Sequence, residues 1–324
     1  MGGAGVATVN DETALLINPA ALGRLRDYFI TIADPELDLS EETERIAGLD
    51  ILKMRDPQEA LNKTLSKPGR HLHTRAQVFP SIVVPNFGFG VFGKYEINAQ
   101  VDADDTTRFL YDYTNDYAAV FGFNFRFLDG MLKIGANARI TNRVEVRESN
   151  LDSSSTDLSL ESLAKEGIGV GSDVGLMLAA PIVWLPTIGA VYRDAGRTSY
   201  TLRDGMFYGT SDRPQSTATT ADVALAIHPI HGNRFRSTWT VEYRDVLTYG
   251  DETHHMRRLH GGFEFNYADA LFLRGGMNQG YWTAGIELAI INYQFQAATY
   301  GEEIGTGDAA RDDRRYVVKF SFRF

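Results

Sequence analysis

The sequence predicts an all-β protein, a transmembrane antiparallel β-barrel of about fourteen strands with an N-terminal plug and a helical extracellular insert. Three observations support this fold class. Apolar and polar residues alternate with a period of two through most of residues 72–324. Short and long connections between the alternating segments follow one another in turn. No segment approaches the roughly 18 uninterrupted apolar residues of a membrane-spanning helix.

Residues 106–127 show the alternation most plainly. Their odd positions are mostly aromatic, and their even positions carry charge, amide and glycine. In a soluble sandwich a second sheet would have to cover the aromatic face, whereas in a membrane barrel that face meets lipid. The segment is roughly twice as long as the 9 to 11 residues that a tilted strand needs to cross the hydrocarbon. We therefore expect Phe121 and Phe123 to face lipid, and the end near Tyr113 to stand above the membrane and support the outer loops.

The connections between strands decide between these two interpretations. The short connections lie at residues 85–86, 129–130, near 181, 229–233, 268–270 and near 291. Most of the others are long and polar, and we predict extracellular loops at residues 34–70 and 148–167. The first of these loops has helical periodicity, which begins where Ser40 precedes two glutamates. Tight turns at one rim and long loops at the other are typical of an outer-membrane barrel, and a soluble sandwich has no reason to separate its loops in this way.

Composition excludes several classes of function. The formal charge of −10 argues against nucleic acid as a partner, because duplex binding needs a concentrated basic face. The absence of cysteine excludes disulfides and thiol chemistry. His254 and His255 are neighbours on a predicted strand and point to opposite faces, so they do not share a metal. Because no nucleophile elbow, P-loop or zinc motif is present, we expect no enzyme, no cofactor and no metal site.

The predicted barrel occupies residues 24–324, and residues 1–23 form a small-residue segment that something else must bury. The N-terminal Met1-Gly2-Gly3 has neither a basic nor an apolar signal region, so we expect a secretory signal to have been removed.

Two groups of side chains are candidates for lining the interior. The inward-facing polar group comprises Arg139, Arg143, Arg147, Glu242, Arg244, Glu264 and Glu287. These residues either pair with one another and hold the plug in place, or line a polar path. A corridor for an apolar ligand would need other residues, for which the candidates are Leu15, Leu16, Ile17, Ile46, Leu49, Leu52 and Met54. The alternative for this apolar group is a small self-packed core above the barrel mouth.

The two ends of the chain resemble known outer-membrane proteins. The final Phe320, Phe322 and Phe324 resemble the C-terminal insertion signal of Gram-negative outer-membrane proteins. This resemblance implies a place in the bacterial outer membrane, contact with membrane lipids, and the outer-membrane assembly machinery as a partner.

The start of the chain, glycine- and alanine-rich and followed by Asn18-Pro19-Ala20, resembles the N-terminal hatch of the FadL-type transporters and their PorV/PorQ-like relatives. In that family the hatch plugs a barrel of this strand number. Asn18, Pro19 and Ala20 would then be the hatch turn inside the lumen. Kinked strands open the wall sideways in these transporters, and Pro80, Gly88 and Gly90 are the candidate kink positions here.

The resemblance implies passive uptake of a hydrophobic ligand such as a fatty acid or a detergent. Two alternatives stay open. A PorV-like protein, of the kind that works in type IX secretion, would hold a secreted or translocon partner with its extracellular loops, mainly residues 40–67 and 151–165. A general polar diffusion channel would conduct ions, which a plug should prevent.

Overall fold

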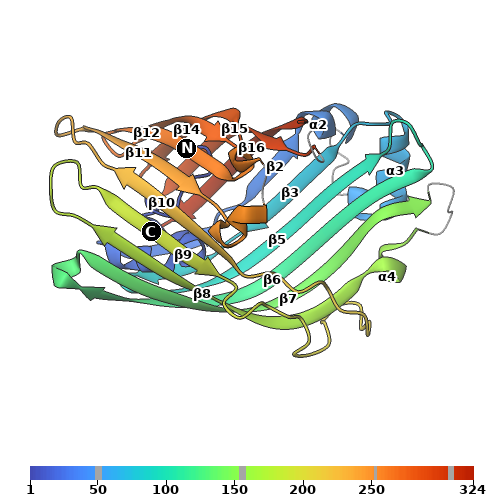
Figure 1. Cartoon of the computed structure of the whole chain (residues 1–324), viewed down its shortest axis with the longest axis horizontal. Coiled ribbons are helices and arrows are strands. Elements are labelled where there is room, and N and C mark those ends of the chain that lie inside the picture. The colour runs from blue at the N-terminus through green and yellow to red at the C-terminus, as the bar shows by residue number, and fades with distance from the viewer. Residues whose placement is uncertain (48–52, 153–157, 252–253, 306–309) are drawn as a thin grey trace.

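The computed structural model describes residues 1–47, 53–152, 158–251, 254–305 and 310–324. Sixteen strand segments form one antiparallel sheet, and the sheet closes because β1 and β2 both pair with β16 (Figure 1). The segments β1 and β2 together fill one strand position, and β3 and β4 fill the next, so the barrel has fourteen strand positions. The predicted antiparallel barrel of about fourteen strands is confirmed. Among the described residues, no helix is long and apolar enough to cross a membrane.

The strand segments follow the chain in order. They are β1 (Phe29–Ala33), β2 (Glu36–Ser40), β3 (Leu72–Val78), β4 (Ser81–Val84), β5 (Phe87–Val101), β6 (Arg108–Phe127), β7 (Leu132–Asp152), β8 (Lys165–Ala179), β9 (Thr187–Arg193), β10 (Thr220–Ile227), β11 (Phe235–Tyr243), β12 (Leu259–Tyr267), β13 (Leu271–Asn278), β14 (Tyr281–Ile290), β15 (Tyr293–Glu303) and β16 (Asp312–Arg323). The helical segments are α1 (Ala14–Ile17), η1 (Pro19–Arg24), α2 (Glu41–Ala47), α3 (Pro57–Leu65), η3 (Leu128–Gly130), α4 (Leu160–Leu163), η4 (Val246–Asp251) and η5 (His255–Arg258).

The predicted separation of the connections is present in the structure. The six predicted short turns lie at the left end of the barrel in Figure 1, and α2, α3 and α4 lie at the right end. The turn at residues 279–280 is also short, but it joins β13 to β14 at the right-hand ends of these strands. The left end is therefore the periplasmic rim and the right end the extracellular one. The helical part of the predicted loop 34–70 lies at the extracellular end as expected.

Two neighbouring strand positions are interrupted at prolines. Pro35 separates β1 from β2, and Pro80 separates β3 from β4. Proline has no N–H to give to the ladder, so the strand bends there. The N–H of Phe79 donates instead to the Asp34 carboxylate beside it. Pro80 thus interrupts its strand position, whereas Gly88 and Gly90 lie within the continuous strand β5.

The strands predicted from the sequence differ from the observed strands at three places. Residues 36–40, predicted as part of the extracellular loop, form β2 and pair with β16 and β3. The alternation of these five residues is too short to recognise, because Pro35 precedes it and a helix starts directly after it at Glu41. The alternation of residues 183–202 predicts one strand, but only Thr187–Arg193 forms it, as β9, because the chain turns away at Asp194, which has a positive φ of 50°. The strand predicted from His255 begins at Leu259, after the 3-10 turn η5.

The outward face of the barrel divides into two zones. In the half nearer the periplasmic rim, Phe121, Phe123 and Phe125 are exposed as a lipid-facing surface requires. Nearer the extracellular rim, Tyr111 and Tyr113 lie on the same face of β6 but are fully buried. The segment that contains Met54 and α3 covers them. The prediction that this end of β6 supports an outer loop is confirmed.

Candidate functional site: the barrel interior

The N-terminal segment, residues 1–25, hydrogen-bonds to the inward-facing side chains of many strands. Asn137 of β7 donates to the Leu15 carbonyl at 2.8 Å. The Glu242 carboxylate of β11 accepts the N–H groups of Gly5 and Val6 at 2.8 and 2.9 Å. His260 of β12 contacts the Gly2 carbonyl at 3.1 Å. The segment therefore runs across the inside of the barrel.

The residues Asn18, Pro19 and Ala20 form a tight turn inside the barrel. The Asn18 side-chain oxygen accepts the N–H of Ala20 at 3.1 Å and so caps η1. Its amide donates to the Val6 carbonyl at 2.8 Å. Pro19 is well suited to the first position of η1, where no intrahelical N–H bond is needed. Asn18 thus ties the two halves of the segment together.

Glycines on the inner wall let this segment lie directly on the strands. A Cβ at Gly175 would come 2.0 Å from the Asn18 side-chain oxygen, and one at Gly135 would come 2.4 Å from the Pro19 carbonyl carbon. Sequence reasoning missed these two residues. The available signal was a glycine at a lumen-facing position, where this chain otherwise places polar side chains.

Burial sets the charge of one acidic residue in the segment. Glu12 is almost fully buried, and burial raises the pKa of its carboxyl to about 7, with a further increase from neighbouring Asp11. Arg323 lies 3.3 Å away and acts in the opposite direction, as does Lys319. The N-terminal segment therefore carries a group that titrates near neutral pH.

The predicted apolar lining is split between two places. Leu15 is buried in the interior, against Val120 of β6 and Met177 of β8, and Leu16 and Ile17 pack on the same cluster. In contrast, Ile46 and Met54 pack around Tyr111 on the outward face of the wall. Leu49 and Leu52 lie outside the described residues. The described part of the chain thus does not bring the apolar candidates together into one corridor.

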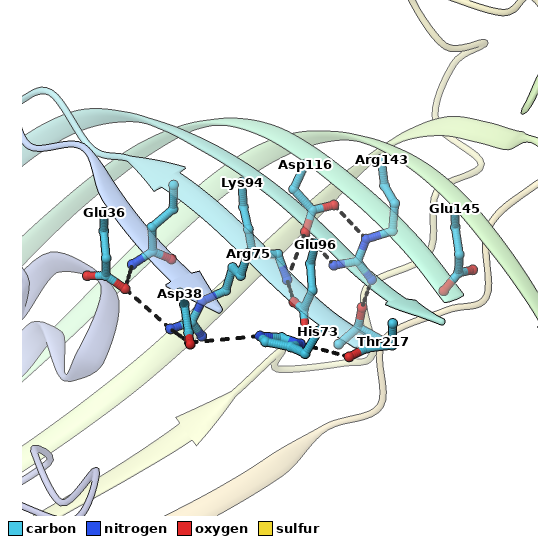
Figure 2. A network of polar contacts seen from close by, with 12 residues as sticks. Glu36, Asp38, His73, Arg75, Lys94, Glu96, Asp116, Arg143, Glu145 and Thr217 are labelled. Carbon is cyan, nitrogen blue, oxygen red and sulfur yellow. Dashed lines mark hydrogen bonds and ion pairs between the residues drawn. The ribbon is translucent and has the colours of Figure 1, made fainter. Parts of the chain in front are cut away.

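Above the N-terminal segment, charged side chains form a ladder across five strand segments (Figure 2). The Arg143 guanidinium holds the Asp116 carboxylate with two bonds of 2.7 and 2.8 Å. Lys94 lies 3.2 Å from Glu96 and 3.8 Å from Asp116. Arg75 continues the ladder to Asp38 at 2.9 Å. Each cation of the ladder thus has at least one carboxylate partner.

The predicted polar residues all belong to this kind of pairing. The contacts are Arg139 with Asp173 at 2.6 Å, Arg147 with Glu145 at 2.9 Å, Arg244 with Glu242 at 3.0 Å, Arg274 with Glu264 at 2.7 Å, and Arg274 with Glu287 at 2.6 Å. Arg244 also donates to the Gly3 carbonyl at 2.6 Å. Sequence reasoning missed Asp38, because its strand was assigned to the insert.

A polar cavity of about 390 Å³ remains between residues 1–3 and the inner faces of β13, β14 and β15. Its lining includes Arg75, Arg274, Gln296 and Tyr300. Within the described ranges no three histidine or carboxylate side chains are grouped as metal ligands. Ala284, Ile286 and Ala297 also contribute to the lining, so the cavity presents both polar and apolar surface.

Comparison with known proteins bears on the fold. No sequence-family profile and no curated protein sequence matches the chain. Among solved structures, the Pseudomonas putida toluene transporter TodX is 13% identical, with a TM-score of 0.54 over 100% of this chain and 96% of that one. The Ralstonia pickettii toluene transporter TbuX is 13% identical, with a TM-score of 0.51 over 100% and 96%. A "deltaS2S3" mutant of TodX, described as a monoaromatic hydrocarbon channel, is 14% identical, with a TM-score of 0.55 over 100% and 97%.

These likenesses cover whole chains and establish the fold. The chain shares the fold of these three structures from end to end. With its closed sheet and its outward apolar zone, it is a transmembrane β-barrel of the outer-membrane type.

Proposed function

We propose that this protein lets hydrophobic small molecules pass through the bacterial outer membrane without energy coupling. The observation that carries the proposal is the N-terminal segment across the lumen, held by side chains of β7, β11 and β12. A segment fixed in this way acts as a plug, and a plugged barrel is a poor route for ions and sugars. The solved structures that share the fold are named as toluene transporters and hydrocarbon channels, which makes monoaromatic compounds the first ligands to test.

Uptake by intact cells tests this function. Cells that express the protein in their outer membrane should take up radiolabelled toluene faster than cells with the empty vector. Uptake of a small sugar, measured in the same cells, should not change. Equal acceleration of both solutes would mean a general diffusion channel, and no acceleration of toluene would contradict the proposal.

A second function, holding a protein partner in the PorV-like manner, is favoured by one feature. The Arg55 guanidinium donates to the Tyr208 hydroxyl at 2.9 Å and so links the extracellular insert to the loop between β9 and β10. The two loops thereby form a continuous outer surface. Crosslinking in whole cells followed by mass spectrometry tests this function. A partner held there should be recovered with the full chain and lost when residues 41–67 are replaced by a short linker.

A further inference from the structure

The turn between β8 and β9 carries four exposed large apolar side chains, more than the other short turns, of which the turn between β14 and β15 exposes Ile291. Residues 180–186 read Ala-Pro-Ile-Val-Trp-Leu-Pro, at the periplasmic rim (Figure 1). Val183 is 80% exposed, and Ile182 and Trp184 are 65% and 59% exposed. Ile230 in the next turn is 75% exposed, and the His228 N–H there donates to the Trp184 carbonyl at 2.6 Å. We call the exposed apolar side chains of these two turns the rim patch; they are Ile182, Val183, Trp184, Leu185 and Ile230.

The turn at residues 180–186 carries no charge. No residue from Val174 to Tyr192 is ionisable at neutral pH, whereas the turns at Asp129 and Asp269 each hold a carboxylate. Placing a charged side chain in the hydrocarbon costs free energy, whereas a charged side chain in water has no such cost. The composition is therefore that of a segment inside a leaflet rather than of a loop in the periplasm.

Most backbone positions of the same turn have no unbonded N–H group, because they are prolines or donate a hydrogen bond within the turn. Pro181 and Pro186 have no N–H. The Ala180 N–H donates to the Pro186 carbonyl at 3.0 Å, Ile182 donates to Ala180 at 2.8 Å, and Leu185 donates to Ile182 at 3.0 Å. Lipid requires backbone groups to be satisfied internally, while a turn in water has no such need.

The position of the turn also fits a membrane location. Leu176, Leu178 and Ile188 are exposed on the outward faces of β8 and β9, and the turn continues this apolar surface beyond the ends of the strands. Trp184 lies at the tip, and tryptophan rings settle at the boundary between acyl chains and headgroups. Trp184 and Leu185 have left-handed φ values of 66° and 47°, a costly conformation for residues with a Cβ.

We propose that the rim patch is inserted into the periplasmic leaflet of the outer membrane. Its partner is phospholipid, which contacts the patch with acyl chains and the glycerol region. The patch makes the apolar surface of the barrel deeper on the β8 and β9 side than beside the charged turns at Asp129 and Asp269. It acts as an anchor that sets the depth of that side.

Tryptophan fluorescence tests the proposal. The chain has three tryptophans, Trp184, Trp239 and Trp282. A protein with Trp239→Phe and Trp282→Phe reports Trp184 alone, and both changes are at exposed outward positions and preserve an aromatic ring. In phosphatidylcholine vesicles whose acyl chains carry bromine, we expect Trp184 to lose most of its emission, and aqueous iodide to have little effect.

A pair of variants, each with one added carboxylate, supplies the matched comparison for the quenching of Trp184. In the protein with Trp184 alone, Val183→Asp should reduce quenching by the brominated lipid, because a carboxylate draws the turn toward water. Asn233→Asp, in the neighbouring turn that already holds His231 and Arg234, should leave the quenching unchanged. If iodide quenches Trp184 strongly and brominated lipid does not, the patch lies in water and the proposal is wrong. The patch would then be a surface for a periplasmic protein.

Discussion

Single residues in the interior decide whether the N-terminal segment stays in place. Glycine at 135 and 175 removes the side chains that would push it off the wall, and Glu242 fixes its start with two backbone bonds. Each bond to a buried carboxylate contributes about 1.5 to 3 kcal/mol. These contacts involve three different strands, so the segment is held at several points rather than hinged at one.

The first prediction concerns Gly175. In Gly175→Ala the added methyl group would meet the Asn18 side chain at 2.0 Å, so the segment must shift. The chain has no cysteine, and a nitroxide on Asn10→Cys, at an exposed position, reports the motion of the segment by electron paramagnetic resonance. We expect a more mobile label in Gly175→Ala. Gly261→Ala is the matched control, since its methyl group has only ordinary contacts at 3.4 Å or more, and equal mobility in the two variants would contradict the account.

The second prediction concerns pH. Burial raises the pKa of the Glu12 carboxyl from its usual 4.5 to about 7. The stability that protonated Glu12 gives to the docked segment is complete below pH 4.5 and is lost as the pH rises through 7. The nitroxide on Asn10→Cys should therefore become more mobile as the pH rises across this range. Glu12→Gln should remove the dependence, and a label that becomes less mobile with rising pH would contradict the assignment.

At the scale of elements, β6 serves two environments with one face. Its Phe121, Phe123 and Phe125 meet lipid, while Tyr111 and Tyr113 hold the extracellular insert. The Tyr111 hydroxyl donates to the carbonyls of Met54 and Arg55, at 3.2 and 2.8 Å. The part of β6 that extends beyond the membrane thus binds the extracellular insert.

The third prediction separates these two roles. Tyr111→Ala removes a buried ring and its hydrogen bonds, a loss on the order of 3 kcal/mol to the docking of the insert. Trypsin should then cut faster at Lys53 and Arg55, while the barrel keeps its resistance to unfolding in detergent. Phe125→Ala changes an exposed lipid-facing ring on the same strand and should leave the cleavage rate unchanged. Equal rates in the two variants would show that the ring does not hold the insert.

The sequence was informative about elements where a strand is long and its two faces meet different surroundings. Alternation in β5, β6 and β7 is long enough to recognise, and the short turns mark the periplasmic rim. It failed at β2, whose five residues are cut off by Pro35, and at β9, which ends where Asp194 turns inward to bond Arg139. The two apolar groups, around Leu15 and around Met54, could not be told apart, because spacing along the chain does not say which side of a wall a loop covers.

The whole molecule combines an interior ladder of paired charges with an outward apolar zone. Arg75, Arg143 and their carboxylates satisfy one another across the wall, so the interior keeps its charges without a free ion. The N-terminal segment occupies the half of the interior nearer the periplasmic rim, and the polar cavity lies above its first residues. The N-terminal segment thus lies inside a closed wall, and the solved structures that share the fold match it over almost their whole length.

Planar bilayer conductance tests this plug most directly. The full-length protein should show no steady ion current, because residues 1–25 lie across the lumen. Deletion of residues 2–22 should open a lumen lined by the polar ladder and give a steady, voltage-independent current. The control is Gly261→Ala in the full-length chain, which should show no steady current. A full-length protein that already conducts steadily, with a current that the deletion does not change, would contradict the account.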